Sequence, residues 1–266
     1  MSIDGGPVSA IDARVLTGIS GFAFDGAGTV YLAEPTSRAL GILIELQPAL
    51  DTISGAVSRA KEFDPYTCCD TFRIGLSDDA EFGLFPPLLT RLREEAPGII
   101  VVVRRANYLL MPSLLASGEI SVGISYTTDL PANAKRKKLR DIGVKVLRGD
   151  KRPNPLTLDE YCERRHTMVS FSGDLSGNID LDLAKVGRTR SVVVAVPQFS
   201  SLRALLVGTE LIATVPDYAA CALVEGCGLR AEDPPFHIEP AELSMVWSGV
   251  HDNDPAERWL RARIVE

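Results

Sequence analysis

A cluster of polar residues follows an apolar, alternating segment in the first half of the chain. Phe72-Arg73-Ile74-Gly75-Leu76 has the pattern of a strand, and Ser77, Asp78, Asp79 and Glu81 come directly after it. Two adjacent carboxylates could exchange protons with a bound molecule, which makes general acid–base catalysis one hypothesis. The same residues are typical of a helix start, where they cap free N–H groups and complement the helix dipole. No histidine or lysine lies nearby in the sequence, so capping is the favoured interpretation for one aspartate.

Two further polar segments follow apolar runs in the second half of the chain. Pro197-Gln198-Phe199-Ser200-Ser201 comes after a β-branched run and opens a helical pattern, so it offers hydroxyls, an amide and free N–H groups to an anion. N-capping explains one serine, whereas two serines and a glutamine favour a ligand contact. Ser170-Phe171-Ser172-Gly173 resembles a nucleophile elbow but lacks the glycine two residues before the serine, which argues against a hydrolase.

No cofactor or metal is expected from the remaining reactive residues. The three histidines, His166, His237 and His251, are far apart, and the adjacent pair Cys68-Cys69 lacks the spacing of a zinc or redox site. The five cysteines are an odd number and are expected to be free thiols in a reducing compartment. The sequence has neither a glycine-lysine phosphate loop nor a GxGxxG motif after a strand, so a nucleotide cofactor is unsupported.

Composition narrows the class of protein. The 266 residues are 45% hydrophobic and 24% charged, which disfavours disordered, fibrous and membrane proteins. The formal charge of -7 argues against a chain that wraps nucleic acid with its whole surface, so any DNA contact needs a local basic patch. There is neither an apolar stretch long enough to span a bilayer nor a signal peptide, and the cytoplasm is therefore the expected location.

The order of the apolar segments predicts an α/β fold. Between Phe72 and Tyr126 the patterns alternate as strand, helix, strand, helix, strand, which is typical of parallel strands covered by helices. In such open sheets ligands bind beyond the carboxyl ends of the strands. A small molecule is therefore expected beside Ser77, Asp78 and Asp79 after the first strand, and beside Ser125 and Tyr126 after the third.

The second half predicts another sheet and a return to the first. The pattern is loose from Asp129 to Asp141, where Lys135-Arg136-Lys137-Lys138 is expected to be a solvated face, and strand patterns resume at Val144. The last strand, Leu243 to Val250, and the last helix, Asp254 to Ile264, suit the first unit better than the second. Two lobes joined by more than one crossing would then form a clamshell. A long helix with a kink or break at Pro48 is expected from Thr36 to about Phe63.

Several of these segments match one family in order and spacing. From about Leu32 onward the chain resembles LysR-type transcriptional regulators, especially the subgroup of nodulation and aromatic-degradation regulators. The matching segments are Glu34-Pro35-Thr36-Ser37-Arg38-Ala39-Leu40, Phe63-Asp64-Pro65, Thr71-Phe72-Arg73-Ile74 with Ser77-Asp78, Pro86-Pro87-Leu88-Leu89, Ala96-Pro97, Leu115 with Gly118-Glu119, Leu139 to Pro153, Val196-Pro197-Gln198-Phe199 and Thr209 to Pro216.

The resemblance implies a two-lobed, periplasmic-binding-protein-like (type 2) effector domain preceded by a dimerising linker helix. The linker would span 32–66 and the effector domain 70–266, with lobe I at 70–138 and 240–266 and lobe II at 139–239. The implied partners are a small aromatic or carboxylate effector, DNA, and further copies of the chain in a homodimer or homotetramer. The effector contacts carried over from the family are Ser77, Asp78, Phe171, Ser172, Gln198, Phe199 and Ser200.

The N-terminal segment departs from the family pattern. Residues 1–31 lack the alanine-rich first helix and the recognition turn of the winged helix-turn-helix, and are expected to be a remnant of the wing or disordered. DNA binding by this chain is therefore an open question. Two alternatives to a regulator are a small-molecule binding protein without DNA binding, and an enzyme that uses the cleft carboxylates. The missing export signal argues against the small-molecule binding protein. The shortage of histidine and the lack of a nucleophile motif argue against the enzyme.

Overall fold

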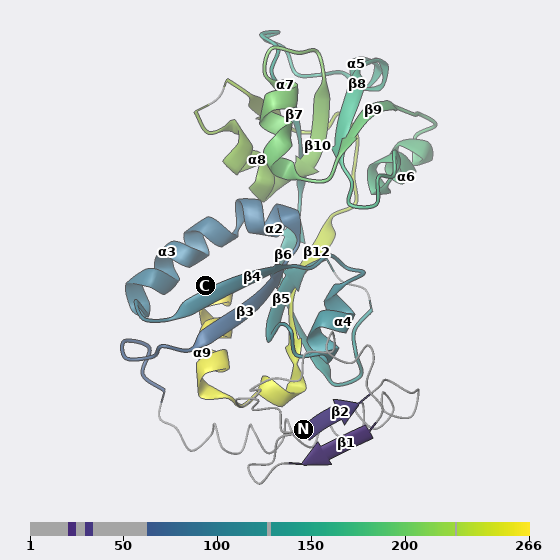
Figure 1. Cartoon of the computed structure of the whole chain (residues 1–266). Helices are drawn as coiled ribbons and strands as arrows, with labels where there is room; N and C mark the ends of the chain where they lie inside the picture. The colour runs from purple at the N-terminus through teal and green to yellow at the C-terminus, as the bar shows by residue number, and fades with distance from the viewer. Residues whose placement is uncertain (1–20, 25–29, 34–62, 127–128, 227) are drawn as a thin grey trace.

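A computed structural model describes two lobes, each built on a five-stranded sheet, and a small separate hairpin (Figure 1). The structure describes residues 21–24, 30–33, 63–126, 129–226 and 228–266. The hairpin pairs β1 (Gly21–Phe24) with β2 (Val30–Ala33) in antiparallel register. The linker helix expected from Thr36 to Phe63 lies almost entirely outside the described residues.

The first sheet has the strand order β4-β3-β5-β12-β6. Its parallel strands are β3 (Thr71–Leu76), β4 (Ile100–Arg105) and β5 (Val122–Ser125), while β12 (Ala241–Ser248) runs antiparallel between β5 and β6 (Ala134–Ile142). Four helices belong to this lobe: α2 (Asp78–Gly83), α3 (Phe85–Glu95), α4 (Met111–Ala116) and α9 (Pro255–Val265). The predicted strand–helix–strand–helix–strand core is confirmed.

The second sheet has the strand order β11-β7-β10-β8-β9. Its strands are β7 (Val144–Arg148), β8 (Arg165–Val169), β9 (Ser191–Val196), β10 (Ile212–Pro216) and β11 (Arg230–Glu232). Around it lie α5 (Leu158–Glu163), α6 (Asn178–Lys185), the 3-10 turn η2 (Phe199–Ser201), α7 (Leu202–Leu206) and α8 (Asp217–Val224). Together the two sheets confirm the expected two-lobed α/β fold.

Close packing of backbone against side chain holds α4 on the first sheet. A Cβ added at Gly123 of β5 would lie 2.2 Å from the Met111 sulfur, and one at Gly75 of β3 would lie 2.5 Å from Ile120 Cδ1. Met111 and Ile120 are completely buried. Since interiors are packed almost without voids, a larger residue at either strand position would force the buried Met111 or Ile120 side chain to move.

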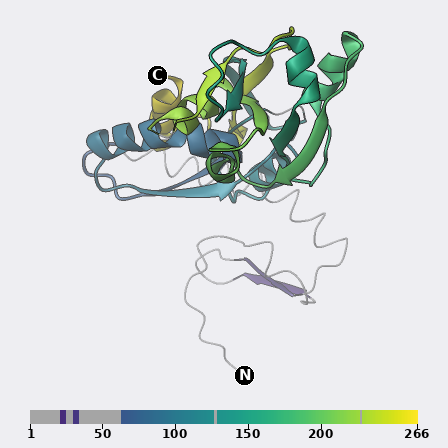
Figure 2. The same cartoon turned by 90° about the horizontal axis from the view of Figure 1, so that it is seen from above.

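The chain crosses between the lobes twice, as expected for a clamshell. The first crossing is at Gly143, between β6 and β7, and the second lies between β11 and β12 (Figures 1 and 2). After the second crossing α9 packs against the first lobe, where the Trp259 ring centroid lies 5.5 Å from that of Phe63 and 6.2 Å from that of Phe72. The expected return of the last strand and helix to the first unit is confirmed.

The basic segment 135–138 belongs to a strand, which the loose sequence pattern did not predict. β6 extends through Ile142 at the edge of the first sheet, so both of its faces carry polar residues and the apolar alternation is lost. Lys135 pairs with Asp252, and Arg136 pairs with Glu242 on the neighbouring β12. The expectation of an irregular segment therefore holds for residues 129–133 and is wrong for 134–141.

Two ionisable groups that are shielded from solvent respond to pH in opposite senses. His166 on β8 is completely buried, its Nε2 lies 2.8 Å from the Tyr161 carbonyl oxygen, and desolvation lowers its pKa to about 4. Glu257 on α9 has a carboxylate oxygen without a hydrogen-bond partner among the described residues, and desolvation raises its pKa to about 7. Each group is therefore held neutral near pH 6.

We predict that His166→Gln and Glu257→Gln change the pH dependence of unfolding in opposite directions. The unfolded chain binds a proton at His166 below about pH 6.5 and the folded chain only near pH 4, so this group makes stability fall as pH drops through that window. Glu257 holds a proton in the folded chain up to about pH 7, so it makes stability fall as pH rises from about 4.5.

Urea unfolding of the wild type and both variants between pH 4 and 7.5 measures these slopes. Removing His166 should flatten the loss of stability toward acid, by up to about 1.4 kcal/mol per pH unit. Replacing Glu257 by glutamine should flatten the loss of stability toward neutral pH by a similar amount. Parallel curves for all three proteins would contradict both assignments.

Candidate functional site

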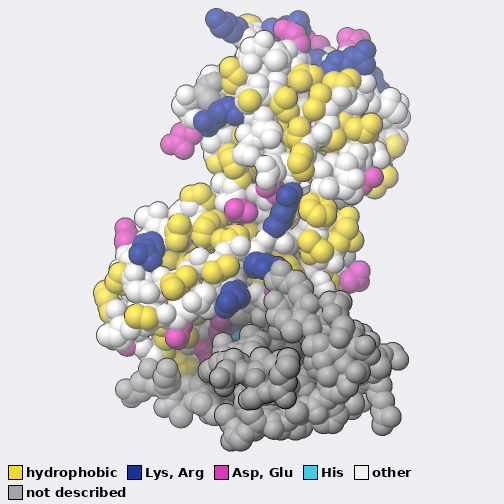
Figure 3. Space-filling view, in the orientation of Figure 1, with side chains coloured by type: hydrophobic (Ala, Val, Ile, Leu, Met, Phe, Trp, Pro, Cys, Tyr) yellow, Lys and Arg dark blue, Asp and Glu magenta, His cyan; other side chains and the backbone are white. Residues whose placement is uncertain are grey.

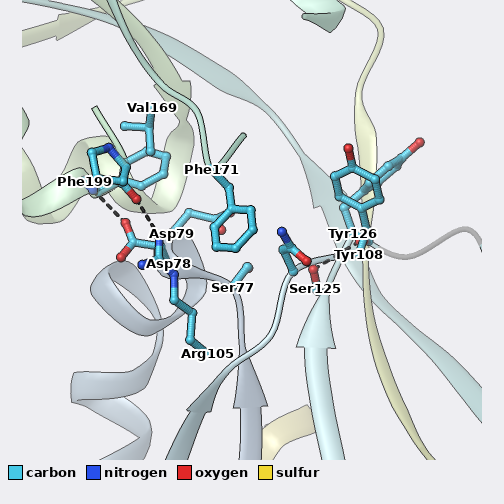
Figure 4. Close-up of a pocket in the computed structure, with 12 residues that line it drawn as sticks. Ser77, Asp78, Asp79, Arg105, Tyr108, Ser125, Tyr126, Val169, Phe171 and Phe199 are labelled. Carbon is cyan, nitrogen blue, oxygen red and sulfur yellow. Dashed lines mark hydrogen bonds between the residues drawn. The ribbon is translucent and has the colours of Figure 1, made fainter. Parts of the chain in front are cut away.

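A cavity of about 190 Å³ lies between the lobes, at the carboxyl ends of strands from both sheets (Figure 4). The first lobe contributes residues that follow β3, β4 and β5, and the second contributes residues at the ends of β8 and β9. This is the position that the fold class predicts for a ligand. The lining residues are Ser77, Asp78, Asp79, Arg105, Asn107, Tyr108, Ser125, Tyr126, Val169, Phe171, Pro197 and Phe199.

Asp78 and Asp79, at the start of α2, both bond to the opposite lobe. A carboxylate oxygen of Asp78 accepts the Phe199 backbone N–H at 2.6 Å, and a carboxylate oxygen of Asp79 accepts the Tyr218 hydroxyl. Ser77 occupies the N-cap of α2 but its side chain makes no cap hydrogen bond. The expectation that one aspartate caps its own helix is therefore wrong, because Asp78 satisfies a backbone donor at η2 of the second lobe instead.

Tyr218 is placed so that it can only donate to Asp79. Burial and the adjacent Asp79 carboxylate raise the pKa of Tyr218, so the phenol keeps its proton. A Cβ added at Gly83 would lie 2.9 Å from the Tyr218 carbonyl oxygen, which shows how closely α2 approaches α8. Gly83 thus permits the close approach of α2 to α8, and the hydrogen bond from Tyr218 to Asp79 strengthens this contact.

Arg105, at the end of β4, makes a further pair of contacts across the cleft. Its guanidinium donates to the Pro197 carbonyl oxygen at 2.7 Å and lies 5.0 Å from the centroid of the Phe171 ring. An ion pair between Arg140 and Asp217 joins the lobes near the first crossing. Acidic and basic side chains accordingly gather at the boundary between the lobes in the space-filling view (Figure 3).

Four of the seven expected effector contacts line the cavity. Ser77, Asp78, Phe171 and Phe199 do so, together with the strand-end residues Asp79, Ser125 and Tyr126. The other three, Ser172, Gln198 and Ser200, are not among the lining residues, and the Ser172 hydroxyl donates to the Asp174 carboxylate. The role of all seven in binding remains a prediction.

The lining residues that sequence reasoning missed come mainly from the loop after β4. Arg105 ends the second strand of the parallel core and Asn107 and Tyr108 follow it, in the same way that Ser77 follows the first strand and Ser125 ends the third. The rule that places ligands at strand ends applies equally to this strand, so the signal was present in the sequence. Val169, at the end of β8, was missed in the same way.

The described residues carry no other recognisable chemical site. No group of three or more histidine, cysteine, aspartate or glutamate side chains that could hold a metal occurs in that part of the chain. Its cysteines, Cys68, Cys69, Cys162 and Cys221, are free. None of its helices has the length and apolar character needed to cross a membrane.

Comparison with known proteins agrees with this architecture. Residues 69–266 match the family model described as the LysR substrate binding domain. The chain belongs to this family. The match begins just before β3 and includes both lobes, so the whole clamshell is a LysR effector-binding domain.

The relatives of this LysR domain include transcriptional activators. The chain is 28% identical to the HTH-type transcriptional activator NahR of Pseudomonas putida, over 86% of this chain and 77% of that protein. It is 30% identical to nodulation protein D 3 of Rhizobium leguminosarum bv. phaseoli, over 87% and 78% of the two chains. The regulatory domain of MexT, a transcriptional activator in Pseudomonas aeruginosa, is 69% identical and superposes with a TM-score of 0.70 over 73% of this chain and 98% of that one. The expectation of a LysR regulator rather than an enzyme is confirmed.

We predict that Tyr218→Phe loosens the contact between the lobes of this LysR domain. Removing the hydroxyl leaves the Asp79 carboxylate without its donor, a loss of about 1 kcal/mol. The neighbouring bond from Phe199 N–H to Asp78 should then open more often, so exchange of the Phe199 amide should accelerate about 5-fold to 10-fold. Amide exchange followed by NMR measures this rate directly.

Tyr161→Phe is the matched control. The Tyr161 hydroxyl lies 2.6 Å from Thr214 Oγ1 within the second lobe, so its removal costs a buried tyrosine hydrogen bond without touching the cleft. This variant should leave the exchange rate of the Phe199 amide unchanged relative to amides of β10. Equal acceleration in both variants would show that Tyr218 acts on global stability alone.

Proposed function

We propose that the interlobe cavity binds a small aromatic effector and that binding shifts the arrangement of the lobes to control transcription. The observation that supports this most directly is the cavity lining, in which the four aromatic residues Tyr108, Tyr126, Phe171 and Phe199 stand beside six polar or charged ones. Ligand sites typically combine apolar and aromatic surface with a few placed polar atoms. Aromatic rings pack against such surfaces by stacking or edge-to-face contact.

The size of the cavity favours a compact ligand. Its volume of about 190 Å³ is close to the roughly 150 Å³ of a cavity that holds benzene. One substituted ring therefore fits the cleft in its present closed arrangement, and a larger effector needs the lobes to separate. Phe171 is half exposed at the cavity, so its ring is accessible to an incoming ligand.

Control of transcription requires that the effector favours one arrangement of the protein over another. A ligand that touches both lobes does so, because its contacts with one lobe are lost when the lobes separate. We infer that this chain acts in the cytoplasm on DNA as a homodimer or homotetramer, in which lobe closure changes how subunits are placed. The relatives named as transcriptional activators support that proposal.

We predict that Phe171→Ala weakens binding of a single-ring aromatic effector about 10-fold. The substitution removes a ring that lines the cavity and that also carries the Arg105 guanidinium. A panel of substituted benzenes and phenols is first screened for ligands by their effect on thermal unfolding, since a ligand that binds the folded chain raises the midpoint, and raises it further with the logarithm of its concentration. Calorimetry on the best ligand then gives the dissociation constant for each variant.

Leu175→Ala is the control for a loss of exposed apolar surface. Leu175 is 58% exposed and Phe171 51%, both lie after β8, and only Phe171 lines the cavity. The Leu175 variant should bind the ligand within about 2-fold of the wild type. Equal affinity of the wild type and the Phe171 variant would place the effector outside this cavity.

A further inference from the structure

The carboxylate of Asp78 occupies the backbone donor that the sequence suggested for an anionic ligand. The segment from Pro197 to Ser201 was expected to offer free N–H groups to an anion, and Asp78 was expected to contact the effector. In the structure these two features bind each other, at 2.6 Å between Asp78 Oδ2 and Phe199 N. The anion at this position is part of the protein.

We propose that Asp78 is a specificity residue that makes the cleft select neutral or cationic aromatic effectors and reject carboxylates. This inference rests on the proposed function of the cavity as an effector site. It goes beyond that function because it assigns the charge of the effector and names the residue that sets it.

The first support is that the Phe199 N–H already donates to the Asp78 carboxylate. Hydrogen bonds with an ionised acceptor are shorter and stronger than neutral ones, and this one spans the two lobes. A carboxylate effector could use the same donor only by displacing Asp78, which would leave two like charges side by side in a small cavity. A neutral effector leaves the bond in place.

The second support is the balance of charge in the lining. It contains two acidic residues, Asp78 and Asp79, and one basic residue, Arg105, which gives a formal charge of -2 + 1 = -1. Arg105 is directed to the Pro197 carbonyl oxygen and the Phe171 ring. An anionic ligand would therefore meet a net negative surface whose one cation already has partners.

The third support is the set of uncharged groups that remain for a ligand. The Asn107 side-chain oxygen accepts the N–H groups of Leu109 and Leu110, so its NH₂ group is the part left to donate. The Ser77 side chain makes no cap hydrogen bond, and the Ser125 hydroxyl donates to the Tyr126 carbonyl while its lone pairs can still accept. These groups suit an amide, a carbonyl or a phenol.

Three ligands of one shape and different charge test the proposal: benzoate, benzamide and the benzamidine cation, together with the matching naphthyl series. Calorimetry at pH 7.5 uses the full chain. In the wild type we expect benzamide and benzamidine each to bind at least 10-fold more tightly than benzoate. In Asp78→Asn, whose amide oxygen can still accept the Phe199 N–H, the preference for benzamidine over benzoate should fall at least 5-fold.

Glu81→Gln is the matched control, because it removes one negative charge from the same helix at an exposed position outside the cavity lining. It should leave the order of the three ligands unchanged. Tightest binding of benzoate by the wild type, or equal selectivity in the Asp78 and wild-type proteins, would overturn the role of Asp78 while leaving the effector site intact. Binding of none of the compounds would overturn the aromatic effector site itself and this inference with it.

Discussion

The closed arrangement of the two lobes depends on the contact between the first turn of α2 and the second lobe. Asp78 and Asp79 are adjacent in sequence, yet they reach different elements, the start of η2 and the ring of Tyr218 on α8. Each aspartate contributes a charge-assisted hydrogen bond, the stronger kind in proteins. The close approach of Gly83 to Tyr218 sets the distance at which both bonds can form. Together with the bond from Arg105 to the Pro197 carbonyl, these contacts hold the strand ends of the two lobes on either side of the cavity.

The same contact explains how far the sequence could predict the site. Strand ends in a parallel sheet converge whatever residues they carry, so Ser77, Ser125 and Tyr126 could be placed at the cavity from the apolar pattern alone. The partner of each aspartate could not be predicted, because Phe199 and Tyr218 are 121 and 139 positions away and the choice depends on the hinge angle. Local sequence indicated helix capping; tertiary packing selected a bond across the cleft instead.

The fold itself was predictable where burial imposes a pattern and unpredictable where it does not. β5 is buried along its whole length, and its apolar run identifies it as a strand. β6 has the opposite situation: it is an edge strand, and its lysines and arginines are exposed or paired with Asp252 and Glu242. A basic edge strand discourages pairing with the strands of other chains. The lysines and arginines that remove the apolar alternation from β6 therefore also oppose aggregation through this edge.

The hydrogen bonds between the lobes limit what an effector can do. The bonds from Asp78, Asp79 and Arg105 already join the lobes, so a ligand changes the equilibrium only by the contacts that it makes in one arrangement and not in the other. A ligand that left these bonds intact would reinforce closure, whereas one that displaced Asp78 would weaken it. Two effectors of equal affinity could thus drive the lobes in opposite directions. If the cavity is the effector site as proposed, the sign of the response is set by whether the effector competes with the protein's own carboxylate, and not by affinity alone.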